Sequence, residues 1–334
     1  MTIIDIAKKS GYGVGTVSRV LNNHPNVSET ARKKIMQVIE EYDFVVNKNA
    51  QLLKQPSKNI LILVKGTSNI LLNSILEIIQ KEIAKTKYTS SVFVLDEYEN
   101  EALRALQFYY ERRPVGIIFL GGNPQRYVTD FEKINVPCVL VTNQAGNVEN
   151  KNISSVGTDD QGASKEITKF LIDNGHKNIG VIGGNKDNSE ITERRYLGFI
   201  SAMKENSLEF DEATQYITTT YSFEGGAAAA KEFAKKANRP TAIFAMSDAM
   251  AIGAIRQFAD MGIKVPEDIS VVGFDGLPFT QYICPRLTTI KQFENQLAKK
   301  GLDLLLNILE ESETYSHDTV PYKLILGETV KKLN

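Results

Sequence analysis

The sequence predicts a small all-helical head joined to a larger α/β body. In the first 45 residues, apolar side chains recur at helical spacing only. After Pro56, short apolar runs alternate with amphipathic segments, a pattern typical of parallel sheets covered by helices on both faces. A body of about 270 residues is large for one such sheet, so we expect two Rossmann-like subdomains.

The head and the body differ in charge. Residues 1–58 contain nine Lys and Arg against five Asp and Glu, so this segment carries +4 while the rest of the chain carries −5. A basic head on an acidic body indicates a head that contacts nucleic acid. Chance clustering of charges on a solvated surface would give the same imbalance.

Composition argues against several classes of protein. The two cysteines, Cys138 and Cys284, match no metal-binding or disulfide pattern. The beginning of the chain does not resemble a signal peptide, and no run of about 18 apolar residues indicates a membrane span. We therefore expect a cytoplasmic protein without a metal or a cofactor.

Three short helices are expected in the head. The first begins at Ile3 and stops at Gly11, the second runs from Val14 to Leu21, and Ser28 is the N-cap of the third. Gly11 permits the sharp turn of a helix-turn-helix. The spacing alone also fits a generic helical hairpin. The outward side chains of the second helix are of types that contact bases and phosphates: Val14, Gly15, Thr16, Ser18, Arg19 and Asn22.

The body should bind a ligand at the carboxyl ends of its strands. The expected strands are Ile60–Val64, Ser91–Leu95, Val115–Leu120, Cys138–Val141, Ile179–Ile182, Ala242–Ala245 and Ser270–Phe274. The expected helices are Leu72–Ile83, Ala163–Asn174, Arg194–Lys204, Gly226–Lys236 and Ala249–Met261. Glycine and polar residues follow the strands directly, and open α/β sheets bind ligands at that edge. The sequence therefore predicts a polar cleft between two subdomains, without a catalytic set.

Three stretches of the head occur in a specific order. They are Asp5-Ile6-Ala7, then Thr16-Val17-Ser18-Arg19-Val20-Leu21-Asn22, then Val27-Ser28-Glu29-Thr30. In these stretches the chain resembles the lactose-repressor-like (LacI/GalR) family of bacterial regulators. The resemblance implies that Val14 to Asn22 is a recognition helix in the major groove, with Ser28 also at the DNA. Gly13 replaces the serine usual at the helix N-cap.

The linker resembles the same family. The resemblance implies a hinge helix that forms on operator DNA, with Asn47 also at the DNA. It places Ala50 and Leu53 in the minor groove, with Leu53 as the wedge that kinks the DNA. Val46 stands where the family usually has proline. Without the head, an ordinary linker would explain this segment equally well.

The resemblance extends over nearly the whole body, which is similar to a periplasmic sugar-binding protein. It implies that Arg195 and Asp275 hold the effector by charge-assisted bonds and that Tyr221 stacks on it. A structural ion pair for Arg195 and a packing role for Tyr221 are the alternatives. Ser247 occupies a further effector position, whereas Asp248 could hold the loop. Asn69 and Thr142 complete the predicted ligand set.

Two departures from the family bear on the ligand. Thr142 and Asn143 stand where many relatives have an acid, and Leu71 and Leu72 stand where some purine-sensing relatives have aromatic residues. The effector is therefore expected to be a sugar or a sugar phosphate rather than a nucleobase. The resemblance implies that it acts by changing how the subdomains close.

The expected domains are the helix-turn-helix at 1–46, the hinge at 47–56 and the effector-binding body at 57–334. Within the body, we assign 57–156 and 288–316 to the first subdomain, and 157–287 and 317–334 to the second. The resemblance implies a homodimer on double-stranded operator DNA, and the chain lacks the heptad tail of a tetramer. Some relatives also bind a phosphocarrier protein.

Two other functions fit the sequence less well. A Rossmann-type enzyme would need a strand–GxGxxG–helix fingerprint or a P-loop, and neither is present. The three histidines, His24, His176 and His317, form no convincing acid–base cluster. A sugar-binding module for transport is opposed by the basic head and the missing signal peptide. A ligand-controlled DNA-binding repressor is the function that the sequence favours.

Overall fold

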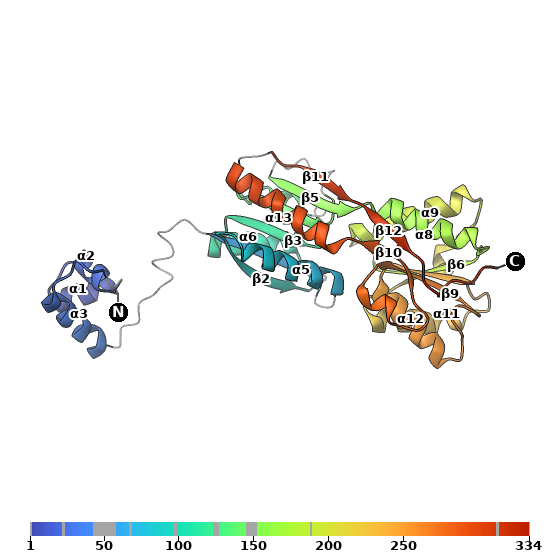
Figure 1. Ribbon diagram of the computed structural model, residues 1–334, viewed down its shortest axis with the longest axis horizontal. Helices are drawn as coiled ribbons and strands as arrows, with labels where there is room; N and C mark the ends of the chain where they lie inside the picture. Colours follow the sequence, from blue (N-terminus) through green and yellow to red (C-terminus); the bar gives the residue numbers. More distant parts are fainter. Residues whose placement is uncertain are drawn as a thin grey trace. The chain divides into compact units, whose positions relative to one another are not determined.

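The chain divides into two compact units, Met1–Ser57 and Lys58–Asn334. Figure 1 shows a helical first unit and a second unit built on two sheets. The expected hinge at 47–56, with Asn47, Ala50 and Leu53, lies outside the described residues, as does Asn22. The computed structural model describes residues 2–21, 24–42, 58–66, 69–96, 99–122, 127–144, 152–187, 189–311 and 314–333.

The first unit contains the three expected helices, α1 (Ile3–Ser10), α2 (Val14–Leu21) and α3 (Glu29–Glu41). Each helix contributes to one small core, whose buried members are Ile6, Ala7, Val17, Val20 and Ile35. Val17 and Val20 therefore face inward on α2, as predicted, and the opposite side of this helix remains at the surface.

Local capping defines the ends of these helices. Gly11 closes α1 in the left-handed region (φ 75°), where its N–H donates to the Ala7 carbonyl. Ser28 is the N-cap of α3, and its hydroxyl accepts from the Ala31 N–H at 3.4 Å. A capping box at the start of α1, formed by Thr2 and Asp5, was not expected.

The first sheet of the body has six parallel strands in the order β11-β5-β4-β3-β1-β2. Its strands are β1 (Asn59–Lys65), β2 (Thr89–Leu95), β3 (Gly116–Leu120), β4 (Cys138–Thr142), β5 (Ile153–Thr158) and β11 (His317–Val320). The accompanying helices are α5 (Ile70–Ile83), α6 (Glu101–Arg112), α7 (Val128–Phe131) and α13 (Glu294–Glu311).

Helices cover both faces of this sheet. Along β1, Ile60, Ile62 and Val64 belong to the core shared with α5 and α13. Leu61 and Leu63 belong to the core shared with α6. Successive side chains of a strand point to opposite faces, so a strand buried on both sides is apolar throughout. This arrangement explains the continuous apolar runs in the sequence.

The second sheet follows the same plan in the order β12-β10-β9-β8-β6-β7, with only β12 antiparallel to its neighbour. Its strands are β6 (Ile179–Gly183), β7 (Tyr216–Thr218), β8 (Ala242–Ala245), β9 (Ser270–Asp275), β10 (Thr288–Gln292) and β12 (Tyr322–Ile325). Its helices are α8 (Asp160–Asp173), α9 (Glu190–Glu205), α10 (Glu212–Gln215), α11 (Phe223–Ala234), α12 (Asp248–Asp260) and the short 3₁₀ helix η2 (Pro278–Gln281).

The expected subdomain limits need correction at two strands. The sequence predicts 288–316 in the first subdomain, but β10 pairs with β9 in the second sheet. It predicts 317–334 in the second subdomain, but β11 pairs with β5 in the first sheet. The chain crosses between the sheets three times, after β5, β10 and β11, because each sheet takes edge strands from the end of the chain.

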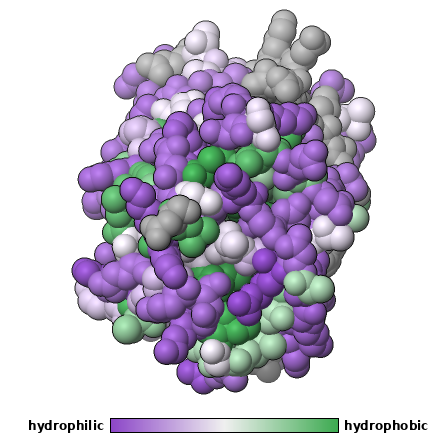
Figure 2. Space-filling model, turned by 90° about the vertical axis from the view of Figure 1, so that its right-hand side faces the viewer, coloured by the Kyte–Doolittle hydropathy of each residue, from purple (hydrophilic) through white to green (hydrophobic). Residues whose placement is uncertain are grey.

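On the face of the molecule that Figure 2 shows, hydrophilic residues predominate, and hydrophobic residues gather in patches between them. Among the described residues, no helix is both long and apolar enough to cross a membrane.

Gly198 brings α9 close to α8. A Cβ built on Gly198 would lie 2.1 Å from the Gln161 carbonyl oxygen, so only glycine fits. We expect Gly198→Ala to lower the free energy of unfolding by about 1–3 kcal/mol, because the added methyl group overpacks the contact between the helices. The higher helix propensity of alanine should offset up to ~1 kcal/mol of this loss. Urea unfolding would measure the loss. Ser201→Ala, on the same helix, is the control, and equal stability of the two variants would contradict the close approach.

Candidate functional site

A cavity of about 670 Å³ lies in the body and is lined by residues from both subdomains. The first subdomain contributes residues that follow its strands and the start of α5: Lys65, Gly66, Asn69, Leu71, Leu72, Asp96, Gly121, Gly122, Thr142 and Asn143. The second contributes Gly184, Asn185, Ser189, Ile191, Arg195, Thr218, Thr219, Thr220, Tyr221, Ser222, Glu224, Asp275 and Gln292. The cavity is thus where the topology predicts a ligand, at strand carboxyl ends.

Five of the six predicted ligand residues line this cavity: Asn69, Thr142, Arg195, Tyr221 and Asp275. The exception is Ser247, which is absent from the lining. Its hydroxyl caps α12 by accepting from the Met250 N–H at 3.2 Å. The serine is buried as an N-cap, a position that favours a short hydroxyl side chain and directs it at the helix backbone.

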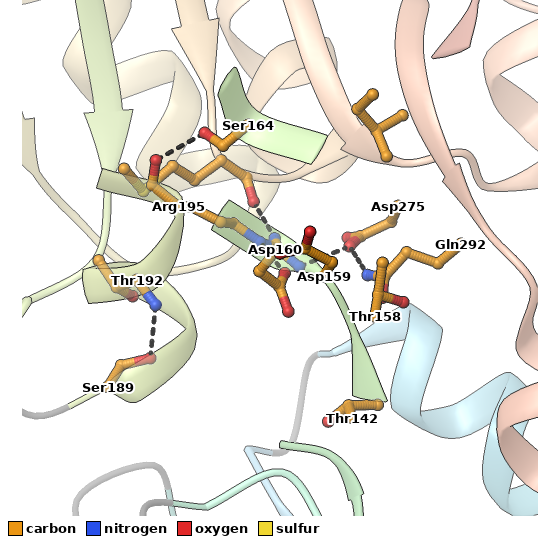
Figure 3. A network of polar contacts seen from close by, with 12 residues as sticks. Thr142, Thr158, Asp159, Asp160, Ser164, Ser189, Thr192, Arg195, Asp275 and Gln292 are labelled. Carbon is orange, nitrogen blue, oxygen red and sulfur yellow. Dashed lines mark hydrogen bonds and ion pairs between the residues drawn. The ribbon is translucent and has the colours of Figure 1, made fainter. Parts of the chain in front are cut away.

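Arg195 is the centre of a buried polar network (Figure 3). Its Nε donates to Asp160 Oδ1 at 2.7 Å, and its Nη2 lies 3.5 Å from Asp275 Oδ1. Nη1 donates to the Met246 carbonyl, and the guanidinium stacks 3.7 Å from the centroid of the Phe274 ring. Arg195 therefore forms a buried ion pair and also lines the cavity.

The network continues from Asp275 to the segments that join the two sheets. Gln292, the last residue of β10, donates its Nε2–H to Asp275 Oδ1 at 2.9 Å. Thr158, the last residue of β5, donates its hydroxyl to Gln292 Oε1 at 2.8 Å. Both strands lead into crossings between the sheets, so hydrogen bonds connect Asp275 to the starts of two crossings.

Two residues that end strands and line the cavity, Thr142 and Asp275, have strained backbone conformations. Among the described residues, four that are not glycine have positive φ, and two of them are Thr142 (82°) and Asp275 (110°). Such conformations cost roughly 1–3 kcal/mol each and collect at functional sites. For a β-branched residue such as Thr142 the conformation is especially unfavourable. The strain directs both backbones at the cavity.

Asp248 holds the loop after β9, as the sequence suggested. Its Oδ2 accepts from the Leu277 N–H at 2.7 Å, and its Oδ1 accepts from the Thr289 hydroxyl at 2.5 Å. Burial raises the pKa of Asp248 well above its ordinary value, and the charge of Asp275 raises it further. Two carboxyl groups therefore share this end of β9, but only Asp275 lines the cavity.

Burial raises the pKa of Asp275 to about 6, although the Arg195 guanidinium favours its ionised form. A raised folded-state pKa stabilises the protein fully below the unfolded-state value of 3.8, and this contribution is lost as the pH rises through about 6. The substitution Asp275→Asn replaces this titratable carboxyl group by an amide that does not titrate. Between pH 4 and pH 7, we expect the wild-type free energy of unfolding to fall by up to about 3 kcal/mol relative to that of Asp275→Asn. Urea unfolding at several pH values would measure the difference, and parallel profiles would contradict the shift.

Tyr221 is held in place by a hydrogen bond. Its hydroxyl lies 2.8 Å from the Thr192 hydroxyl, and its ring lies against the Gly184 backbone, where any Cβ would collide with it. Burial raises the pKa of this phenol, so it is neutral at physiological pH. A fixed, neutral ring at the cavity wall is suited to stacking on a ligand.

Several lining residues were not predicted from the sequence. Lys65, at the end of β1, forms an ion pair with Glu101 at 2.7 Å. Asp96 follows β2, Gln292 ends β10, and Glu224 lies in the first turn of α11. For Lys65 and Asp96, the available signal was their place at a strand carboxyl end. Because the sequence did not predict β10 as a strand, Gln292 was not recognised as a residue at a strand end.

The exposed side of α2 carries the residues predicted to contact DNA. Val14 (43% exposed), Gly15 and Arg19 are exposed, whereas Thr16 and Ser18 are half-buried. No atom lies within 4 Å of a Cβ built on Gly15. Ser28 is exposed but already caps α3 with its hydroxyl. The first helical turn therefore presents little side-chain bulk, and Arg19 is the charged group of this face.

Comparison with known proteins agrees with both units. Residues 2–47 match the model of bacterial regulatory proteins of the lacI family, and residues 168–330 match that of the periplasmic binding protein-like domain. The HTH-type transcriptional regulator MalR of Clostridium butyricum is 35% identical over 97% of this chain and 98% of its own length. The chain belongs to the LacI family.

As a LacI-family member, the chain is a DNA-binding, ligand-controlled transcriptional repressor, and its relatives are regulators rather than enzymes. Catabolite control protein A of Priestia megaterium is 28% identical over 99% of both chains. Two solved structures share the fold. The lac repressor dimer bound to operator and the anti-inducer ONPF has a TM-score of 0.73 at 22% identity, covering 99% of both chains. The transcriptional regulator CelR–cellobiose complex has a TM-score of 0.72 at 23% identity, covering 98% of this chain and 99% of that chain.

Among the described residues, no group of three or more His, Cys, Asp or Glu could hold a metal ion. His176 is buried, with Nδ1 3.0 Å from the Thr241 hydroxyl and Nε2 3.0 Å from the Lys331 carbonyl, and burial lowers its pKa. It joins strand ends of the second subdomain and does not line the ligand cavity.

Proposed function

We propose that this LacI-family protein acts in the cytoplasm and represses a carbohydrate-utilisation operon. We further propose that a sugar bound in the cavity controls its affinity for operator DNA. The observation that carries the proposal is the Arg195–Asp275–Gln292 cluster. A guanidinium, a carboxylate and an amide together can both donate to and accept from the neighbouring hydroxyls of a sugar.

The cluster also supports a route from ligand to DNA. A sugar that contacts Asp275 acts next to Gln292, whose amide oxygen accepts from Thr158 at 2.8 Å where the chain crosses between the sheets. Ligand contacts that differ between an open and a closed arrangement of the subdomains would shift the population between them. In a homodimer, such closure would change the spacing of the two heads.

At the DNA, we propose that α2 enters the major groove with Val14, Gly15, Thr16, Ser18, Arg19 and Asn22, with Ser28 beside it. The proposed hinge contacts, Asn47, Ala50 and Leu53, rest on the family resemblance. Binding of a phosphocarrier protein rests on the resemblance alone and remains a prediction.

The test is to capture operator DNA with the purified full-length protein. We would incubate it with fragmented genomic DNA from its source at moderate salt, sequence the retained fragments, and repeat the capture with added sugars. A near-palindromic site beside carbohydrate-utilisation genes, with occupancy that one sugar changes, is the expected result. A specific site beside unrelated genes would remove the carbohydrate assignment. Retention without sequence preference, with and without sugars, would refute operator recognition.

A further inference from the structure

The three crossings that join the two sheets converge on one pair of strand ends. The first crossing leaves β5 after Thr158, and the second leaves β10 after Gln292. Thr158 lies opposite Val320, the last residue of β11, and Gln292 lies opposite Tyr322, the first residue of β12. The third crossing is therefore the single residue between Val320 and Tyr322, and it runs beside the starts of the other two.

One hydrogen bond ties these crossings to each other. The Thr158 hydroxyl donates to Gln292 Oε1 at 2.8 Å, across 134 positions of the chain. Thr158 is fully buried, and Gln292 is only 1% exposed. A buried amide oxygen without a donor is costly, because it has given up its hydrogen bonds to water. The bond therefore holds the two strand ends in one fixed relation.

The same bond orients the Gln292 amide (Figure 3). Because Oε1 accepts from Thr158, Nε2 is directed at Asp275 Oδ1, to which it donates at 2.9 Å. A carboxylate only accepts hydrogen bonds, so the reverse orientation of the amide would bring two acceptors together. Gln292 and Asp275 line the cavity, whereas Thr158 is not among the lining residues. The Thr158 hydroxyl thus decides, from outside the cavity, which end of the amide meets Asp275.

We infer that Thr158 is a positioning residue of the effector site, whose hydroxyl fixes the Gln292 amide on Asp275 and thereby limits how freely the two subdomains move about the crossings. This inference rests on the proposed function and deepens its regulation. Thr158 acts through Gln292 alone, since it does not line the cavity. Without the hydroxyl, the amide is free to turn away from Asp275, and the first two crossings lose the side-chain bond between them.

The test compares four variants of the full-length protein. Thr158→Val removes the hydroxyl with little change of shape, and Thr158→Ser restores it. Thr168→Val is the matched control, because Thr168 is also fully buried but donates its hydroxyl to the Ser164 carbonyl within α8 at 2.7 Å. Both valine variants lose one buried hydrogen bond, so a loss of stability common to both is not a sign of positioning. Gln292→Met removes the whole bridge and sets the largest effect expected from Thr158→Val.

The first readout is the pKa of Asp275. The hydrogen bond from Gln292 favours the ionised carboxyl, so Thr158→Val should raise this pKa from about 6 by roughly one pH unit. Urea unfolding of each variant, with and without Asp275→Asn, gives two stability profiles against pH. Their difference levels off at the folded-state pKa, so a higher pKa moves that point to higher pH. The variants keep the other titratable groups that act on Asp275 or on which it acts: Asp160, Arg195, Tyr221 and Asp248.

The second readout is the distance between the subdomains, measured by pulsed electron paramagnetic resonance. Spin labels are attached through Lys133→Cys in the first subdomain and Lys169→Cys in the second, where the lysine side chains are 57% and 58% exposed. Cys284→Ser removes the exposed native thiol, whereas Cys138 is buried. Dilution with unlabelled protein restricts the measured distances to one chain. Thr158→Val should broaden the distance distribution, and the other two threonine variants should leave it as in the wild type.

Either of two results would overturn the inference. One is an Asp275 pKa or a distance distribution in Thr158→Val that equals that of Thr168→Val, and the other is an effect that Thr158→Ser does not reverse. If Thr158→Val does not fold, Thr158→Ala takes its place under the same criteria. Operator capture is run on the same wild-type preparation. With specific capture intact, a negative result rejects the role of Thr158 alone, whereas capture without sequence preference rejects the proposed function itself.

Discussion

Arg195→Met is expected to lower the free energy of unfolding by about 3–5 kcal/mol and to abolish the response to the effector. The substitution leaves Asp160 and Asp275 buried without their shared cation. Burial already raises the pKa of Asp160 against the favourable charge of Arg195. Removing the guanidinium therefore leaves a buried carboxyl pair whose ionised forms are uncompensated. Urea unfolding would measure the loss of stability, and operator release by the effector would measure the response.

Two further variants show which property of Arg195 matters. Arg195→Lys keeps the charge but cannot reach Asp160, Asp275 and the Met246 carbonyl together, because an ammonium lacks the planar fork. It should retain part of the stability and still lose most of the effector response. Arg256→Met, which breaks the exposed ion pair with Asp260, is the control and should change stability by less than about 1 kcal/mol. A response to the effector in Arg195→Met would refute the assignment of the cavity.

Arg19→Ala should weaken operator binding by about 5- to 150-fold, which corresponds to about 1–3 kcal/mol for one specific base contact. Arg19 is exposed on the outward face of α2, away from the core residues Val17 and Val20. The fold should therefore be unaffected, and the loss should be greater for operator than for random DNA. Fluorescence anisotropy with both DNAs at several salt concentrations would measure the ratio.

The matched control for this loss is Lys33→Ala, an exposed charge on α3. Removing a charge that only attracts phosphates should weaken binding to all sequences about equally and reduce the salt dependence. Arg19→Ala should instead narrow the difference between operator and random DNA. If the two variants reduced both affinities in the same proportion, Arg19 would be a phosphate contact and would not read bases.

The central strands and the edge strands differed in how well the sequence predicted them. All seven apolar runs are strands. Six of them lie in the interior of a sheet, where a strand is buried on both faces, and the seventh, β2, is an edge strand. The sequence did not predict the edge strands β7, β11 and β12, nor the interior strands β5 and β10, whose buried residues include Ser155 and Thr289. An edge strand is paired on one side only, so its residues need not be uniformly apolar and its pattern is weak.

The site was predicted in a similarly uneven way. Arg195, Asp275 and Tyr221 were identified through the family resemblance, and all three line the cavity. Ser247 matched the same pattern but caps a helix, a role that a serine beside a helix start commonly takes. Lys65 was missed, because a lone lysine after a strand carries no pattern until Glu101, 36 residues later, is placed beside it.

The sequence by itself determined the division into a helical head and an α/β body, the helix-turn-helix, most of the interior strands, and three residues of the cavity lining, Arg195, Tyr221 and Asp275. These features depend on the spacing of apolar residues and on short motifs, which are local in the chain. Only the tertiary structure decided which sheet takes β10 and β11, that Gln292 and Thr158 connect Asp275 to the crossings, and that both cavity cations are paired. Such contacts join residues up to 162 positions apart, as in the pair Ser155 and His317. They depend on how the chain returns three times between the sheets, which local spacing cannot specify.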